Sequence, residues 1–189
     1  MKNRGNRRFF GFDISTKSRL GQVWIETVIY TLIAFVMIGL VLSFAKPKIE
    51  EIQDKATLQQ STDMLKQIDS TILTIGSAGN QRIFDPLTIK EGELKIDGAE
   101  DKIIFQMDSK NVYSEPGKII SDGNVKVYTE KKTEFSTVTL TLDYSAKYDI
   151  KFDGVDELKT IPSAPTPYKL YIVNEGEEDD KIILNMSLG

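Results

Sequence analysis

The chain contains an apolar run from Val23 to Ala45, in which Glu26 is the only charged residue. An α-helix of 23 residues covers roughly 34 Å, and the hydrocarbon core of a bilayer is about 30 Å thick. The run therefore predicts a transmembrane helix. A total of 189 residues leaves room for one further folded domain.

The charge on either side of this run predicts the orientation of the chain. The overall net charge is -4, but residues 1–21 contain six basic residues and one acidic residue, a net charge of +5, so the rest of the chain carries -9. Basic residues that flank a membrane helix stay on the cytoplasmic side. We therefore expect the N-terminus inside the cell and an acidic domain outside, which disfavours binding to nucleic acid.

Helical periodicity resumes beyond Pro47, which lies just past the apolar run. Residues at alternating three- and four-residue spacings form the expected buried stripe, namely Leu58, Ser61, Leu65, Ile68, Ile72 and Ile75. Proline inside a helix removes one backbone hydrogen bond and bends the helix without necessarily ending it. We predict one long helix with a kink at Pro47, composed of a membrane part over 22–45 and a continuation over 46–79, where glycines and Asn80 end it.

After Asn80 the periodicity changes to short alternating runs separated by Gly, Asp, Asn and Pro. The clearest run places Val138, Leu140 and Leu142 on one face and threonines on the other, as in a half-buried strand. The expected strands lie in GELKID, DKIIFQM, NVKVYTE, TEFSTVTLTLDYS, YDIKFD, YKLYIVN and KIILNMSL, with an extended proline-rich loop over 161–167. The predicted fold class is α+β: a long N-terminal transmembrane helix, then a mostly antiparallel β-sheet domain over 80–189.

The start of the apolar run contains a distinctive junction. In KSRLGQVWIET, residues 17–27, basic residues and then Gly21 stand directly before the run, and Glu26 follows the glycine by five residues. This junction resembles the processing site of type IV pilins with class III signal peptides, whose subunits also place a long helix before a sheet. The resemblance implies that prepilin peptidase removes residues 1–21 and that Gln22 becomes the new N-terminus. Gln at this position is more similar to archaeal pilins than to bacterial ones.

The resemblance also implies a role for Glu26. A charged side chain at the centre of a membrane helix costs about 2.5 to 3.5 kcal/mol, and less near the interface, so this carboxylate needs compensation. In the family, the corresponding glutamate pairs with the N-terminal amine of a neighbouring subunit, here the amine of Gln22.

By resemblance, the chain is a structural subunit that waits in the cytoplasmic membrane and then joins an extracellular surface filament, as an adhesive or accessory pilin rather than as a subunit of a swimming filament. The implied partners are other copies of the chain or related pilins, the prepilin peptidase, and an assembly ATPase with its membrane platform. Two alternatives stay open. The leader could remain in place, which would make the chain a single-pass anchored domain that binds a ligand outside the cell. Cleavage after Ala45 would instead release the domain, although the apolar run is long for a secretory signal.

The remaining motifs are few. Asn185-Met186-Ser187 matches the N-glycosylation sequon and makes Asn185 a candidate glycan acceptor on the outer domain. The acidic run from Glu175 to Asp180 lacks the spacing of a calcium loop and is expected to be a solvated turn. The chain has no Cys and no His, which excludes thiol and imidazole catalysis and thiolate zinc sites. We expect no enzyme activity, no catalytic or metal site, and no cofactor.

Overall fold

The computed structural model describes residues 18–189, with side chains described from Val23 onward. Most of the predicted leader lies outside the described residues. Gly21 and Gln22 fall within the first helix, but their side chains are outside the described part as well. The chain divides into two compact units, Met1–Pro47 and Lys48–Gly189.

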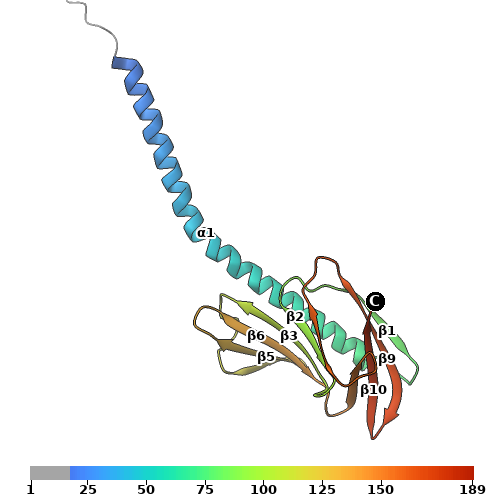
Figure 1. The fold of residues 1–189 in the computed structure, drawn as a ribbon. Coiled ribbons are helices and arrows are strands. Elements are labelled where there is room, and N and C mark those ends of the chain that lie inside the picture. The colour runs from blue at the N-terminus through green and yellow to red at the C-terminus, as the bar shows by residue number, and fades with distance from the viewer. Residues whose placement is uncertain (1–17) are drawn as a thin grey trace, which may run out of the picture. The chain divides into compact units, whose positions relative to one another are not determined.

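One helix, α1 (Ser18–Leu73), contains the apolar run and includes Pro47 (Figure 1). By length and composition it is apolar enough to cross a membrane, and no residue of its most apolar 18-residue window is buried. The predicted order of a long apolar N-terminal helix followed by a mostly antiparallel β-sheet domain is confirmed.

The helix ends at Leu73, before the predicted boundary at residue 79. Gly76 has a φ of 79°, in the left-handed region that glycine adopts without a steric penalty. The side chain of Asn174 donates a hydrogen bond to the Gly76 carbonyl oxygen (2.7 Å), and the backbone of Asn174 exchanges hydrogen bonds with Gly79 and Asn80. Contacts with the sheet therefore replace helical hydrogen bonds over residues 76–80, which is why the helix stops early.

The β-domain has two sheets (Figure 1). The four-stranded sheet has the order β1 (Gln81–Leu87), β9 (Tyr168–Glu178), β10 (Lys181–Leu188), β7 (Tyr148–Phe152). The six-stranded sheet has the order β4 (Ile119–Asp122), β5 (Val125–Lys131), β6 (Ser136–Asp143), β3 (Lys102–Ser109), β2 (Glu93–Asp97), β8 (Leu158–Pro162). Neighbouring strands pair antiparallel except β10 and β7, which are parallel.

The core of the Lys48–Gly189 unit forms between the sheets and the second half of α1. Every residue of the predicted helical stripe is buried: Leu58, Ser61, Leu65, Ile68, Ile72 and Ile75. The apolar members join one core with inward-facing residues of both sheets, such as Phe105, Leu140 and Leu184. Full burial of an aliphatic or aromatic side chain contributes about 1.5 to 3 kcal/mol, so this stripe fixes the helix to the sheets.

The strand pattern agrees with the prediction in the centre of each sheet. Val138, Leu140 and Leu142 are buried on one face of β6, as expected. Thr137, expected on an exposed face, is also buried, and its hydroxyl is satisfied because it donates to Asp108 Oδ1 at 2.7 Å. The expected proline-rich loop begins later than residue 161, since β8 continues to Pro162.

Candidate functional site

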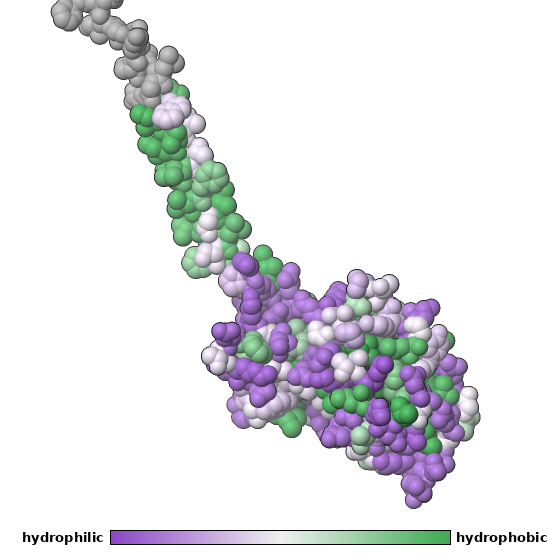
Figure 2. All heavy atoms as spheres, in the orientation of Figure 1, coloured by the Kyte–Doolittle hydropathy of each residue, from purple (hydrophilic) through white to green (hydrophobic). Residues whose placement is uncertain are grey.

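The first candidate site is the apolar surface of α1 between Val23 and Phe44. Large hydrophobic side chains are exposed along this whole segment, with Trp24 71 % and Phe44 78 % exposed. Figure 2 shows this part of the helix as predominantly hydrophobic. Contiguous apolar patches larger than a few hundred Å² mark membrane or protein interaction sites, so this surface needs lipid or other protein around it.

Glu26 is the only charged residue on this surface. It is exposed and, among the described residues, its carboxylate has no hydrogen-bond or ion-pair partner. The two threonines next to it are satisfied inside the helix: Thr27 Oγ1 donates to the Val23 carbonyl (2.9 Å), and Thr31 Oγ1 donates to the Thr27 carbonyl (2.8 Å). The segment would therefore enter an apolar environment with one charged group, the Glu26 carboxylate.

Pro47 lies inside α1, and the boundary between the two compact units falls directly after it. Proline has no backbone N–H, so the helical hydrogen bond that position 47 would donate to the carbonyl of Ser43 is missing. The apolar run and the domain-packed part of the helix thus meet at its weakest backbone position.

Asn185 lies on the outward face of the four-stranded sheet together with Ser187, and it is half-buried. Its Nδ2 donates to Glu175 Oε1 (2.7 Å), and its Oδ1 accepts the backbone N–H of Gly154 (3.0 Å). A glycan on Nδ2 leaves one N–H on that nitrogen, so the bond to Glu175 and a glycan are chemically compatible. Glycosylation of Asn185 stays a prediction.

The acidic run was expected to be a turn, but residues Glu175 to Glu178 belong to β9 and pair with β10, so only Asp179 and Asp180 form the turn between the two strands. Asp179 and Asp180 have φ values of 49° and 63°, and both side chains are exposed. Within the described part of the chain, no group of three or more His, Cys, Asp or Glu side chains is placed to hold a metal ion. The turn has the geometry of a solvated hairpin connection.

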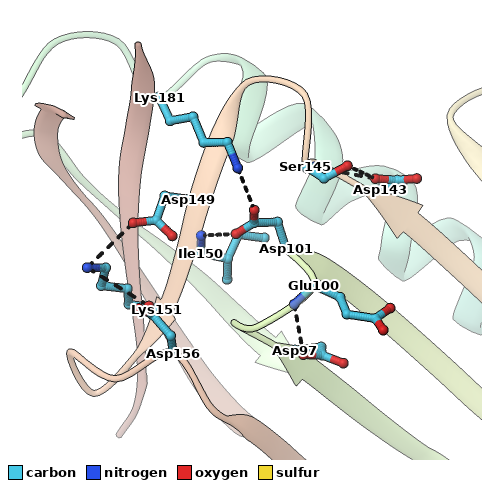
Figure 3. Close-up of polar contacts among 10 residues, drawn as sticks. All are labelled: Asp97, Glu100, Asp101, Asp143, Ser145, Asp149, Ile150, Lys151, Asp156 and Lys181. Atoms are coloured by element: carbon cyan, nitrogen blue, oxygen red, sulfur yellow. Dashed lines mark hydrogen bonds and ion pairs between the residues drawn. The ribbon is translucent and has the colours of Figure 1, made fainter. Parts of the chain in front are cut away.

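Sequence reasoning missed a polar junction centred on Asp101, which Figure 3 shows between the two sheets. Asp101 lies in the β2–β3 turn with a φ of 53° and is 7 % exposed. One carboxylate oxygen accepts the backbone N–H of Ile150 on β7 (2.8 Å), and the other accepts Lys181 Nζ on β10 (2.9 Å). The bond to Asp101 raises the pKa of Lys181.

A second polar junction joins α1 to the six-stranded sheet. Asp69 accepts a hydrogen bond from the Tyr144 hydroxyl (2.9 Å) and another from Asn124 Nδ2 (2.8 Å). Burial, together with the charge of Asp69, raises the pKa of Tyr144. Along the same helix, Lys66 pairs with Asp122 (2.7 Å). Each of these contacts forms only when Asp69 and Lys66 face the sheet. Together they therefore fix the rotation of α1 about its axis.

The chain matches no protein-family model, and comparisons with curated proteins and with solved structures give no match either. The function is therefore inferred from the chain's own residues.

Proposed function

We propose that this chain is the structural subunit of a type IV pilus-like surface filament. In this proposal, prepilin peptidase cuts after Gly21, and the mature chain polymerises through the apolar part of α1. The observation that carries the proposal is the exposed apolar helix surface with a single carboxylate at Glu26, attached to a compact domain with its own core. Such a helix is stable in lipid before assembly and in a bundle of like helices afterwards.

The partner of Glu26 in the filament is the amine of Gln22 in a neighbouring subunit. This amine is free only after cleavage, so processing and assembly are coupled. Removing both charges from water is favourable only if they meet in good geometry, and a lone carboxylate in the helix bundle is strongly disfavoured. The pair therefore sets the axial register of neighbouring helices, while apolar packing supplies most of the contact.

The edges of the sheets support assembly through the helix rather than through strand addition. Exposed edge strands pair with other chains unless they are short, charged or interrupted by proline. The edge strand β4 has four residues and ends at Asp122, β8 contains Pro162, and β1 contains Pro86 and a register shift. The edge strand β7 carries Asp149 and Lys151. All four edges are therefore poor templates for strand pairing.

The remaining partners follow from the same proposal. The basic N-terminal segment stays in the cytoplasm, and the β-domain lies outside the membrane, where a glycosylation system can reach Asn185. An assembly ATPase and its membrane platform move the processed subunit from the bilayer into the filament. The role is mechanical and adhesive, without catalysis, and the acidic domain disfavours nucleic acid as a ligand.

Intact mass and N-terminal sequencing of the native membrane-associated protein test the proposed processing. We expect the first residue to be Gln22. A first residue of Met1, in cells that contain prepilin peptidase, would contradict the proposal and favour an uncleaved single-pass anchor with an outer binding domain. A first residue of Lys46 would indicate a secreted domain.

Substitution of Glu26 tests assembly separately from processing. We expect Glu26→Ala to be inserted and cleaved normally but to form no filaments by electron microscopy. Glu51→Ala is the matched control, because it removes a glutamate from the same helix outside the apolar run. Filaments at the wild-type yield in the Glu26→Ala variant would refute the role of Glu26.

A further inference from the structure

Two hollows on the Lys48–Gly189 unit meet at one ion pair. The first, of about 280 Å³, lies on the outward face of the six-stranded sheet, and the second, of about 510 Å³, lies at the end of that sheet beside Asp69 of α1. Lys126 and Asp143 line both hollows, and their side chains pair at 3.1 Å. The two hollows are therefore adjacent across this ion pair, and together they are called the β5–β6 groove.

The floor of the groove on the sheet face is apolar. Ile119 and Tyr128 are a cross-strand pair between β4 and β5, and they are 67 % and 38 % exposed. Ile104 and Thr141, paired between β3 and β6, line the same hollow and are half-buried. Because the two isoleucines and the tyrosine face solvent, the floor presents an apolar and partly aromatic platform for a ligand.

The walls of the same hollow are charged but balanced. Lys102 pairs with Glu100 (2.7 Å), and Lys126 pairs with Asp143 (3.1 Å). Each positive side chain thus already has a carboxylate next to it. An anionic or cationic ligand would have to break one of these pairs, whereas an uncharged ligand with hydroxyl groups can hydrogen-bond to both partners of a pair.

The hollow at the end of the sheet is more polar. Its lining includes Asp69, Ser121, Asn124, Ser145 and Lys147. The ammonium group of Lys147 lies 5.3 Å from the centre of the Tyr148 ring. Hydroxyl and amide groups donate and accept hydrogen bonds, and the Lys147 ammonium group donates them, so the lining can bind the hydroxyls of a bound chain.

We propose that the β5–β6 groove binds an uncharged oligosaccharide. A pyranose ring has an apolar face of C–H groups and a rim of hydroxyls, which matches an apolar floor between balanced ion pairs. This inference concerns the domain alone and does not depend on filament assembly.

The experiment measures binding of the full-length chain in detergent micelles to three oligosaccharide probes by calorimetry. The probes are a neutral glucose hexamer, a neutral N-acetylglucosamine hexamer and an anionic uronic acid hexamer. We expect at least one neutral hexamer to bind and the uronic acid hexamer to bind at least tenfold more weakly. Absence of binding to both neutral hexamers, or a preference for the anionic one, would overturn the proposal.

Two variants locate the site. We expect Ile119→Ser and Tyr128→Ala each to weaken neutral-hexamer binding roughly tenfold, which corresponds to about 1.4 kcal/mol. Leu158→Ser is the matched control, because Leu158 is 55 % exposed on β8, the opposite edge of the same sheet. Equal loss in all three variants would overturn the placement. Self-association of the wild-type chain that Ile119→Ser abolishes would show instead that a second copy covers the groove.

Discussion

The carboxylate of Asp101 accepts the backbone N–H of Ile150 at 2.8 Å, and this bond ties the β2–β3 turn of one sheet to β7 of the other. Ile150 is fully buried, so its N–H has no access to water in the folded state. A buried donor that loses its acceptor costs more free energy than a typical hydrogen bond contributes, because its desolvation is no longer compensated. Asp101 is therefore expected to matter to the stability of the domain.

We predict that Asp101→Ala lowers the free energy of unfolding by about 2 to 4 kcal/mol, because it leaves the Ile150 N–H without an acceptor and Lys181 without its carboxylate. Asp101→Asn should cost less, since an amide oxygen can still accept from Ile150. Urea unfolding of the full-length chain in micelles, followed by the β-sheet circular dichroism signal, measures both. As a control, Asp149→Ala removes a half-buried partner of Lys151 (3.5 Å) that water still reaches, and pairs near the surface contribute about 0 to 1 kcal/mol. Equal losses for Asp101→Ala and Asp149→Ala would contradict this account.

From the raised pKa of Tyr144 we predict that the domain loses stability at alkaline pH. Burial raises the pKa of Tyr144 in the folded state above its usual value of 10.0, and the Asp69 carboxylate adds to this shift. Above pH 10 the unfolded chain loses the phenol proton of Tyr144, while the folded chain retains it because its pKa is higher. The contribution to stability is thus fully present below about pH 10 and declines as the pH rises further. The raised pKa of Lys181 acts in the same direction.

Tyr144→Phe should therefore lower stability at pH 7 by about 1.5 kcal/mol, through loss of the hydrogen bond to Asp69, and should also reduce the decline above pH 10. Thermal unfolding between pH 7 and pH 11 measures the two effects. Tyr128→Phe serves as the control, because within the described residues its hydroxyl has no hydrogen-bond partner. An alkaline decline as steep in Tyr144→Phe as in the wild type would show that another group is responsible.

The central strands and the edge strand β7 were predictable from sequence, whereas the edge strands β1, β4 and β8 were not. Strands β3, β6 and β10 have one buried face and one solvated face, so their sequences alternate. In the edge strand β4 all four residues are exposed, and in β8 only Ile161 is buried. Because alternation comes from burial of one face, these strands carry no such pattern, and β1, β4 and β8 were missed. The helical stripe from Leu58 to Ile75 was visible for the converse reason: it packs on the core throughout.

Some candidate sites could likewise be recognised from the sequence, and others could not. Glu26 stands out in sequence because it is one charge within a long apolar run. Asp101 does not, since an aspartate in a turn is common, and its partners Ile150 and Lys181 lie far along the chain. The β5–β6 groove combines residues from α1 and five strands, so no local pattern could indicate it.

Two variants of the sequon separate glycosylation of Asn185 from the hydrogen bonds that its side chain makes. If the native protein is glycosylated, the mass of the mature chain should exceed the mass calculated from Gln22 to Gly189, and Asn185→Gln should remove the excess. Asn185→Gln should also destabilise the unglycosylated chain made in a host without the modification system, by about 0.5 to 1.5 kcal/mol, because the hydrogen bonds to Gly154 and Glu175 are lost. Ser187→Ala is the matched variant, since it removes the sequon but retains these bonds. An excess mass that persists in Ser187→Ala would exclude Asn185 as the acceptor.

We predict that α1 is kinked at Pro47, and this kink can be measured in solution. The missing hydrogen bond to the Ser43 carbonyl, and the clash of the proline ring with it, should bend the helix by more than about 20°. Residual dipolar couplings of the backbone N–H groups report segment orientation, and in the wild-type chain residues 30–44 and 50–64 should fit two different helix axes. Pro47→Ala should bring both segments onto one axis. Gly39→Ala is the control, because the added Cβ meets nothing within 4 Å and raises helix propensity without restoring the hydrogen bond at position 47. Wild-type couplings that fit one axis would refute the kink.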